Sequence, residues 1–555
     1  MTDMTEKANK PAAESSLCGL VRDFVVRASG NDERLAALCR NLLAEEAKGN
    51  VCMRLRPEET DMLRGKSPLV SIAPDRSGSL FVLSPKSNLL YTRRNWCYED
   101  TVRRRIGKMA QVEPEAGIEV PTDGAFANLN VCQREAIARM ISRKFTILTG
   151  GPGTGKTYTI ARAVKLIRDR KPELRLGLAA PTGKAAARIN EAMRREAEAL
   201  NMDGISSAVT LDSLLLSEYD LVTYKHDRKN PLELDWLIVD EASMVSLPLM
   251  AKMLDALPEE CRLTLVGDAD QLSSVEPGRV FGDLCDMNVV NANGCKCELR
   301  ESKRFPPDGE IARLADAVNR GDWEYALKLL REPGNRNIRY IELGKNGAAV
   351  EPEQGSFMGI VKEKLVSFCA ATAAAEALDT LNDCRILCVL RHGRYGCEKL
   401  NREMLKRLRR DYPQCPIPVM ITKNNSTLGV SNGDVGVVIP CDGASSSASE
   451  GLSLPADGGN VREIPFSLLP DREMAFATTV HKAQGSEFRN VVLVLPELPE
   501  DAPARSLLTR ELFYTALTRT GDGVFFIYAD DDTIKECCKR KTARRTGLQE
   551  AEGLS

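Results

Sequence analysis

The stretch FTILTGGPGTGKT, residues 145–157, joins a short apolar run to a glycine-rich turn that ends in lysine and threonine. The apolar run predicts a buried β-strand, and the residues after it have the pattern of a helix. A strand, a glycine-rich turn and a helix in this order form a phosphate-binding loop, whose backbone N–H groups and helix N-terminus surround the phosphates of a nucleotide. The stretch therefore predicts an α/β sheet that binds a nucleoside triphosphate.

Short apolar runs followed by helical stretches recur along much of the chain. Continuous apolar strands that alternate with helices are typical of a parallel sheet covered on both faces. The runs are RLGLAAP (175–181), WLIVDEA (236–242), RLTLVGD (262–268), RILCVL (385–390), NVVLVLP (490–496) and GVFFIYAD (523–530). They predict an α/β protein with two parallel-sheet halves, at residues 116–300 and 301–555.

Three further regions differ in composition from these halves. Residues 1–16 are polar, and we expect a disordered tail. Residues 17–115 lack a phosphate-loop pattern and predict a mainly helical N-terminal domain. Within the second half, residues 415–470 contain NG and DG turn signals between β-branched runs, which predict a small inserted β-barrel.

The overall composition limits the class of protein. With 555 residues the chain is too long for one core, and roughly one domain per 150 residues predicts three or four domains. Hydrophobic residues make up 43% and charged residues 28%, as in soluble globular proteins. The sequence has no apolar run of about 18 residues and no signal-peptide pattern. We therefore expect a cytoplasmic protein with no membrane partner.

Charge and cysteine content leave the binding partner open. The 76 basic and 78 acidic residues give a net charge of −2, which does not indicate nucleic-acid binding. It does not exclude such binding either, because a groove needs only a local stripe of Lys and Arg. The 17 cysteines are scattered and form no pair of CxxC motifs. We interpret them as reduced, packed thiols, with a metal cluster as the minor alternative.

The glycine-rich turn and two later strand ends predict a site that hydrolyses ATP with Mg²⁺. Lys156 would reach the β- and γ-phosphates, and the Thr157 hydroxyl would bind Mg²⁺. In LIVDEA (237–242), Asp240 would hold Mg²⁺ and Glu241 would deprotonate the attacking water. Gln271 could contact the γ-phosphate, although an Asp/Gln pair that caps a loop is an alternative. The predicted nucleotide-binding residues are Gly150, Gly151, Pro152, Gly153, Thr154, Gly155, Lys156 and Thr157.

Phosphoryl transfer also calls for a cation that approaches the γ-phosphate from across a cleft. Arg304 in ESKRF and Arg519 in YTALTRT lie outside the core motifs of the first half. Taken alone, each arginine is more often a surface ion pair. Together with the loop, they are candidates for stabilising charge in the transition state.

The order of the motifs resembles that of superfamily 1 DNA helicases of the 5′→3′ branch. These motifs are Gln133, GGPGTGKT (150–157), APTGKAA (180–186), VDEAS (239–243), GDADQL (267–272), SKRF (302–305), TTVHKAQGSEF (478–488) and ELFYTALTR (511–519). Within that group the chain is most similar to the RecD family, the alpha chains of exodeoxyribonuclease V. The stretches similar to that family are LRHGRYGCEKLN (390–401), residues 418–438 and TARRTGLQ (542–549).

The resemblance implies two RecA-like motor domains, a partner-binding N-terminal domain and an SH3-like form for the inserted barrel. It assigns Gln133 to the adenine edge of ATP and Gln271, Arg304 and Arg519 to the γ-phosphate. It assigns the contact with single-stranded DNA to Pro181, Thr182, Gly183, Lys184, Thr479 and His481. His481 would then read the position of the strand, since too few other histidines and no paired cysteines are available for a metal site.

The resemblance also implies a biological role and its alternatives. The chain would be an ATP-dependent helicase that unwinds DNA ends in double-strand break repair by homologous recombination. It would act in a heterotrimer with a RecB-like beta chain, which holds the nuclease site, and a RecC-like gamma chain. A free-standing 5′→3′ helicase and a non-moving, ATP-binding regulatory subunit are the alternatives.

Two residues depart from the family pattern. Asp212 replaces a histidine that the family usually carries near DNA, and an acid there would repel a phosphate backbone. Lys303 replaces an aromatic residue that usually precedes the arginine at position 304. A stacking contact is therefore expected to be missing at this point.

Overall fold

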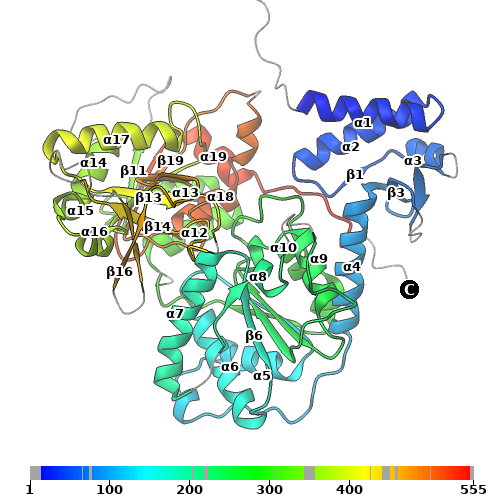
Figure 1. Ribbon diagram of the computed structural model, residues 1–555, viewed down its shortest axis with the longest axis horizontal. Coiled ribbons are helices and arrows are strands. Elements are labelled where there is room, and N and C mark those ends of the chain that lie inside the picture. Colours follow the sequence, from blue (N-terminus) through cyan, green and yellow to red (C-terminus); the bar gives the residue numbers. More distant parts are fainter. Residues whose placement is uncertain are drawn as a thin grey trace, which may run out of the picture.

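The computed structural model describes residues 14–64, 67–73, 78–202, 206–217, 223–306, 308–342, 357–425, 427–440, 451–456, 460–500 and 502–549. They form an N-terminal domain, two α/β domains and an antiparallel insertion in the second of them (Figure 1). In the described part of the chain, no helix combines the length and the apolar character needed to cross a membrane.

The first α/β domain contains a six-stranded parallel sheet in the order β10-β5-β9-β8-β6-β7. Because successive side chains of each strand point to opposite faces, the apolar strands predicted from the sequence bury both faces. Helices α5, α6 and α7 cover one face, and α4, α9 and α10 cover the other. Its elements are η1 Gly124–Phe126, α5 Val131–Ser142, β5 Phe145–Gly150, α6 Lys156–Arg170, β6 Leu176–Ala180, α7 Gly183–Leu200, β7 Val209–Thr210, α8 Leu211–Leu214, β8 Trp236–Val239, η2 Ala242–Met244, α9 Leu247–Ala256, β9 Arg262–Gly267, α10 Val280–Asp286, α11 Asn288–Ala292 and β10 Lys296–Leu299.

The second α/β domain repeats this plan with a five-stranded parallel sheet in the order β11-β20-β19-β12-β18. Helices α12, α13, α18 and α19 pack on one face and α14 to α17 on the other. Its elements are α12 Glu310–Arg320, α13 Trp323–Leu330, β11 Ile338–Glu342, α14 Phe357–Lys364, α15 Val366–Ala370, α16 Ala374–Thr380, β12 Cys384–Cys388, α17 Cys397–Asp411, β18 Ala477–Thr479, β19 Asn490–Val494, η4 Pro503–Leu507, α18 Arg510–Leu517, β20 Phe525–Ala529 and α19 Asp531–Lys539.

The insertion is a five-stranded antiparallel sheet in the order β16-β15-β14-β13-β17. Its strands are β13 Ile417–Ile421, β14 Val435–Val438, β15 Gly451–Pro455, β16 Val461–Pro465 and β17 Arg472–Met474. The last strand lies beyond residue 470, where the predicted insertion ends. Closure of this sheet into an SH3-like barrel stays a prediction.

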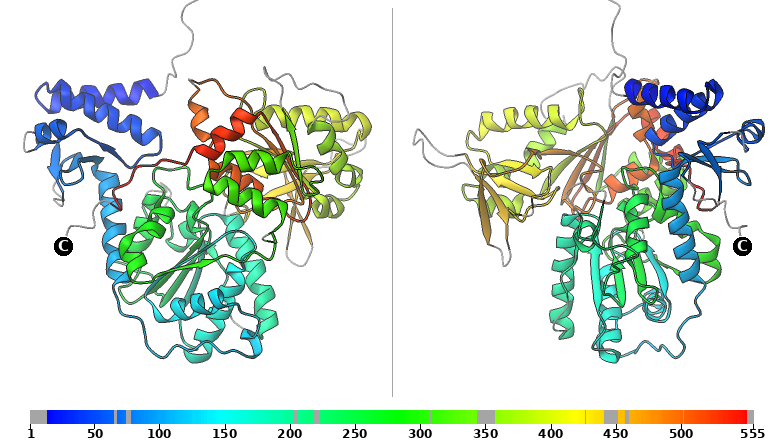
Figure 2. Two further views of the ribbon diagram at one scale, coloured as in Figure 1. Left: turned by 180° about the vertical axis from the view of Figure 1, so that it is seen from behind. Right: turned by 45° about the vertical axis from the view of Figure 1, so that its right-hand side comes forward.

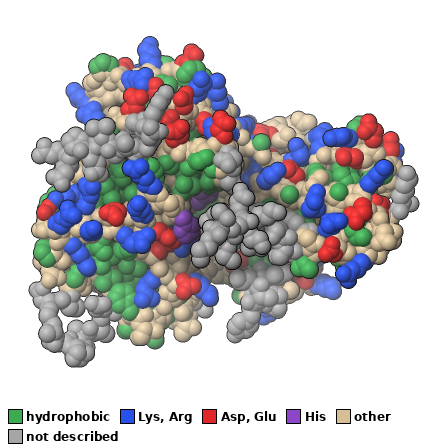
Figure 3. Space-filling model, turned by 90° about the horizontal axis from the view of Figure 1, so that it is seen from above, with side chains coloured by type: hydrophobic (Ala, Val, Ile, Leu, Met, Phe, Trp, Pro, Cys, Tyr) green, Lys and Arg blue, Asp and Glu red, His purple; other side chains and the backbone are tan. Residues whose placement is uncertain are grey.

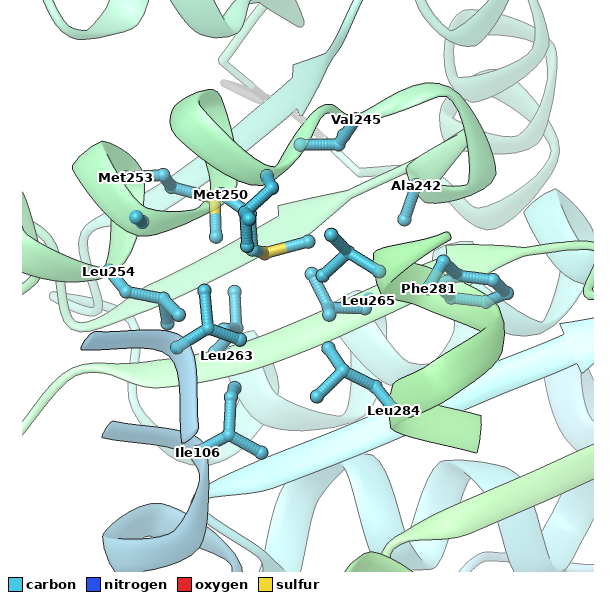
Figure 4. Close-up of a cluster of buried hydrophobic side chains, with 14 of the residues drawn as sticks. Ile106, Ala242, Val245, Met250, Met253, Leu254, Leu263, Leu265, Phe281 and Leu284 are labelled. Atoms are coloured by element: carbon cyan, nitrogen blue, oxygen red, sulfur yellow. The ribbon is translucent and has the colours of Figure 1, made fainter. Parts of the chain in front are cut away.

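The N-terminal domain is mainly helical but also contains a four-stranded sheet, β1-β4-β3-β2, that the sequence does not predict. Its elements are α1 Glu14–Ala28, α2 Glu33–Ala47, β1 Cys52–Arg54, α3 Pro57–Leu63, β2 Val70–Ile72, β3 Phe81–Ser84, β4 Leu89–Thr92 and α4 Arg93–Ala110. The predicted tail of residues 1–16 lies mostly outside the described residues, and its last three residues are in α1. Ile106 of α4 packs beside Leu254 and Leu263, so this helix shares the core of the first α/β domain (Figure 4).

The C-terminal segment, residues 541–549, corrects the predicted boundary of the second half at residue 555. It leaves the second α/β domain after α19 and runs across to α4, as the red trace shows in Figures 1 and 2. The Gly547 N–H donates to Glu99 Oε2 at 2.9 Å, and Leu548 is buried in the core of the first α/β domain. Contacts far apart in sequence place this segment, and local sequence patterns carry no signal for them.

Glu99 predicts a pH dependence of stability. Burial raises the pKa of Glu99 from 4.5 to about 7, although Gly547 and the Tyr91 hydroxyl both donate to it. Because the folded pKa exceeds the unfolded one, this carboxyl stabilises the fold fully below pH 4.5 and loses that contribution as the pH rises through 7. The difference is about 3 kcal/mol.

Glu99→Gln, which cannot ionise, should remove this dependence. Urea unfolding between pH 5 and 8 should show wild type losing more stability with rising pH than the variant. Buried carboxyls away from Glu99 titrate equally in both proteins, so the difference between the two curves reports Glu99 together with its interaction with Asp283. Parallel curves would contradict the assignment.

Candidate functional site: a charged cluster between two parallel sheets

The glycine-rich loop turns tightly between β5 and α6 and touches the chain that leaves the first sheet. Gly153 has a φ of 77°, and a Cβ there would lie 2.5 Å from the Arg304 Cβ. The Ser302 hydroxyl donates to Pro152 O at 2.9 Å, and the Lys303 N–H donates to Gly153 O at 2.9 Å. Only glycine permits this approach at position 153. The first residues of the second α/β domain therefore pack directly against the loop.

Lys156 lies inside the loop, near the half-buried Asp240 and the buried Asp268, which directly follow the neighbouring strands β8 and β9. Its ammonium donates to Gly150 O at 2.6 Å and to Gly151 O at 3.2 Å. Burial and the adjacent Glu241 raise the pKa of Asp240 to about 6, while the charge of Lys156 opposes that rise. Burial also raises the pKa of Asp268, again against Lys156. The carboxyl ends of β5, β8 and β9 thus meet around one cation.

Glu241 has an unusual backbone for a residue other than glycine. Its φ is 50° and its ψ is 37°, in the left-handed region, and it begins the 3₁₀ helix η2. The Glu241 N–H donates to Asp240 Oδ1 at 2.7 Å. Such strain costs on the order of 1 kcal/mol and persists where the surrounding structure imposes it. Here it lies directly after Asp240, between the end of β8 and the start of η2.

The interface between the two α/β domains, here called the seam, is held by hydrogen bonds from α18 and the 479–487 segment. The Tyr514 hydroxyl donates to Asp268 Oδ2 at 3.1 Å, and the Leu272 N–H donates to Thr515 Oγ1 at 3.0 Å. Gln484 Nε2 donates to Leu272 O at 2.8 Å. Gln271 is buried and donates to Asp268 Oδ2 at 2.9 Å, so the Asp/Gln contact considered from the sequence does form.

The two predicted arginines lie on the second domain's side of the seam. Arg519 is only 3% exposed and donates to Thr515 O and Ser486 O. Burial lowers its pKa, and the facing Glu241 opposes that effect. Arg304 is half-buried and forms an ion pair with Glu487 at 2.6 Å. The structure therefore brings both arginines to the cluster, and Arg304 is ion-paired there.

Gln133 lies beneath the loop. Its Nε2 donates to Thr154 O at 3.5 Å, and its Oε1 accepts from the Asn130 N–H in a capping box at the start of α5. A Cβ on Gly155, which has a φ of 82°, would lie 2.8 Å from Gln133 Nε2. The side chain thus supports the loop directly.

The predicted DNA contacts form two groups. The 181–184 group begins α7, where the Thr182 hydroxyl accepts from the Ala185 N–H. A Cβ on Gly183 would lie 2.2 Å from Ser431 Oγ of the insertion, and Lys184 donates to Ser486 Oγ at 2.6 Å. Burial, followed by the charge of Arg385, lowers the pKa of Lys184 to about 8.

Thr479 and His481 form the second group, at the end of β18 and just after it. The Thr479 hydroxyl accepts from the Lys482 N–H at 3.4 Å. Burial, followed by the charge of Arg544, lowers the pKa of His481. Among the described residues, no hydrogen bond joins this pair directly to the 181–184 group.

A cleft of about 1260 Å³ lies between α7, the insertion and the 482–488 segment. Seen from above, Lys and Arg alternate with Asp and Glu among the described side chains of the visible face (Figure 3). Basic residues outnumber acidic ones in the lining of the cleft. Its Lys and Arg residues are Lys184, Arg188, Arg194, Arg385, Arg462 and Lys482, against the acids Glu191, Asp434 and Glu487.

The two departures from the family pattern have partners of their own. Asp212 accepts a hydrogen bond from the Tyr224 hydroxyl at 2.7 Å. The Lys303 ammonium lies 5.2 Å from the centre of the Tyr158 ring. Each of these two side chains thus contacts a tyrosine of the same chain.

Several residues of the site have no role in the sequence-based assignment. Asp268, Tyr514 and Thr515 join the domains, while Arg188 donates to Glu487 at 2.9 Å beside Arg304. Tyr514 and Thr515 fall within the ELFYTALTR motif, so their motif was found but not their contacts. Arg188 and Glu487 come from opposite domains, so no local sequence pattern reveals that they form a pair.

Comparison with known proteins gives consistent matches. Residues 133–277 match the AAA domain family, and residues 474–527 match the UvrD-like helicase C-terminal domain. The "RecBCD enzyme subunit RecD" of Mycobacterium tuberculosis H37Rv is 35% identical over 94% of this chain and 92% of its own length. The "ATP-dependent RecD2 DNA helicase" of Deinococcus radiodurans is 28% identical over 75% of this chain but only 52% of its own. A Bacteroides Pif1 structure bound to single-stranded DNA aligns at 17% identity over 73% of this chain and 93% of its own, with a TM-score of 0.43.

Tyr514→Phe should weaken the seam. It removes one donor from the buried Asp268 and should lower the free energy of unfolding by about 1–3 kcal/mol. Tyr340→Phe is the matched control, since it removes a hydroxyl bonded to the half-exposed Asp531 within the second domain. Denaturant unfolding should rank Tyr514→Phe as the more destabilising change. Equal effects would show that the Tyr514 bond adds nothing special to the seam.

Proposed function

Since this chain belongs to the RecD family of RecBCD enzyme subunits, it is an ATP-dependent DNA helicase, and we propose that it moves 5′→3′ as the alpha subunit of exodeoxyribonuclease V. In this role it unwinds DNA ends in double-strand break repair by homologous recombination. The observation that carries the proposal is the 35% identity, which extends over 94% of this chain and 92% of the relative.

The proposed catalytic set is Lys156, Asp240, Glu241, Gln271, Arg304 and Arg519. Lys156 and the loop N–H groups hold the phosphates, and Glu241 accepts the proton of the attacking water. Arg519 faces Glu241 from the second domain, which supports its assignment to the γ-phosphate. Arg304 would leave its ion pair with Glu487 and bind the γ-phosphate instead. Gln133 is proposed at the adenine edge, where its contact with the loop supports the assignment.

Thr157 and Asp240 are proposed to hold Mg²⁺. A hydroxyl and a carboxylate are oxygen ligands of the kind Mg²⁺ prefers; Thr157 follows Lys156 in α6, and Asp240 directly follows β8. When bound, the metal neutralises charge on the β- and γ-phosphates. Burial raises the pKa of Asp240, and a neighbouring cation would favour its ionised form.

Coupling between hydrolysis and movement is proposed to run through the seam. Residues on both sides of it contact the nucleotide site, so closing the seam on ATP and opening it after hydrolysis would move one domain against the other. Pro181, Thr182, Gly183 and Lys184 would hold the strand on one domain, and Thr479 and His481 on the other. The basic cleft beside α7 supports a sequence-independent grip on phosphates.

The RecB-like beta chain and the RecC-like gamma chain are proposed partners, and the N-terminal domain is their proposed docking site. This chain is 35% identical to a RecD subunit and 28% identical to the RecD2 helicase, which favours the subunit over the free-standing helicase. The intact set of Lys156, Glu241 and Arg519 argues against a regulatory subunit that binds ATP without moving. An SH3-like barrel at the insertion is part of the same proposal.

Lys156→Gln should lower DNA-stimulated ATP hydrolysis on the order of a hundredfold or more, because it removes the cation at the phosphates. Lys165→Gln is the matched control, since Lys165 lies on the same helix and forms an ion pair with Asp169. Phosphate release with and without single-stranded DNA measures both. Activity retained by Lys156→Gln would contradict the proposed site.

Purification from the native host tests the assembly. We expect the chain to co-purify with a beta and a gamma chain. Alone, it should unwind duplexes with a 5′ single-stranded tail and leave those with a 3′ tail intact, without degrading DNA. Recovery as an active protein free of both chains would favour the free-standing helicase. Nuclease activity that follows the pure subunit would contradict the proposed division of labour.

A further inference from the structure

The C-terminal segment crosses the seam a few residues after it leaves α19. On the second domain's side, the buried carboxyl of Glu511 in α18 accepts from both the backbone N–H and the hydroxyl of Thr542, the latter at 2.9 Å. Helix α18 also carries Tyr514, Thr515 and, just beyond its end, Arg519. The segment is therefore tied to the helix that holds the seam.

Two residues later, Arg544 reaches the first domain. Its Nη1 donates to three carbonyl oxygens, Ser274 O at 2.5 Å, Glu276 O at 2.8 Å and Gly278 O at 2.9 Å. These carbonyls belong to residues 274–278, which directly follow Gln271 and Leu272. One end of this short loop is thus held by Thr515 and Gln484, and the other end by Arg544.

Arg544 also faces the N-terminal domain and the second predicted DNA-contact group. Gly49 has a φ of 91°, and a Cβ there would lie 3.0 Å from Arg544 Nε. Gly278 N–H donates to Gly49 O at 2.9 Å. The charge of Arg544 acts on the imidazole of His481. One guanidinium thus lies where three parts of the protein meet.

We propose that Arg544 is a positioning residue that keeps the 271–278 loop and the 479–487 segment in register across the seam, so that DNA contact on one domain changes hydrolysis at the other. The part that concerns DNA rests on the proposed function. Arginine suits this position because it stays charged when partly buried and its planar head fixes the direction of its donors. Loss of the side chain would leave three carbonyls without this donor.

The same junction connects the motor to the N-terminal domain. The Arg545 N–H donates to Asn50 Oδ1 at 2.7 Å, and the Val51 N–H donates to Arg545 O at 2.8 Å. Arg545 directly follows Arg544 in the chain. Movement of the N-terminal domain would therefore displace Arg544. A partner chain bound to that domain could alter hydrolysis through Arg544 without touching the nucleotide.

The test compares three variants of the full chain: Arg544→Ala, Arg544→Lys and Arg545→Ala. Arg545 is the matched control, because it carries the same charge next door on an exposed side chain. We expect Arg544→Ala to lower the DNA-stimulated kcat about tenfold while the KM for ATP and the basal rate stay within about twofold. Lysine, with three donors, should recover most of the loss, and Arg545→Ala should match wild type.

Amide hydrogen exchange supplies a readout that does not depend on DNA. Arg544→Ala should speed exchange in both 271–278 and 479–487, which lie on opposite domains. Faster exchange confined to 541–549, or an equal fall in basal and DNA-stimulated hydrolysis, would overturn the proposal. If wild type showed no stimulation by DNA, the proposed function would fail, and the exchange pattern alone would decide the role of Arg544.

Discussion

The ammonium of Lys156 faces two carboxyls, the half-buried Asp240 and the buried Asp268, at the ends of adjacent strands. Charges are costly to bury unless they are paired, and the charge of Lys156 opposes that cost at both carboxyls. Both carboxyls nevertheless have raised pKa values, which shows that burial still outweighs the attraction. The site is consequently short of positive charge, and a cation or an arginine from the second domain would relieve it.

This shortage of positive charge explains why side chains of the second domain matter at the seam. Tyr514 donates to Asp268, and Arg519 lies buried opposite Glu241, so the second domain supplies hydrogen bonds and charge that the first domain lacks. Both residues lie on or just after α18, a helix of eight residues. A small rotation of α18 would therefore change the polar contacts of Asp268 and Glu241 together. Catalysis and domain position are linked by geometry at this helix.

Much of the fold could be predicted from the sequence, and the reason is local. The strand that precedes the glycine-rich loop, the acids after β8 and the later apolar strands each have a pattern within a few residues. The four-stranded N-terminal sheet was missed because its strands are three or four residues long, too short for a clear periodicity. The contacts of Arg544 and Tyr514 were missed for a different reason, since their partners lie about 270 and 246 residues away. Motif recognition finds such residues but not what they touch.

The burial of Leu548 has a consequence for how the protein is made. Its side chain lies in the same core as Val51, Trp96 and Phe145, so this core contains residues from both extremes of the described chain. During synthesis, the N-terminal domain and the first sheet emerge long before this leucine does. The core is therefore complete only after the chain has been synthesised through residue 548. Contacts between residues so far apart in sequence form late in folding, because the entropy of closing a long loop opposes them.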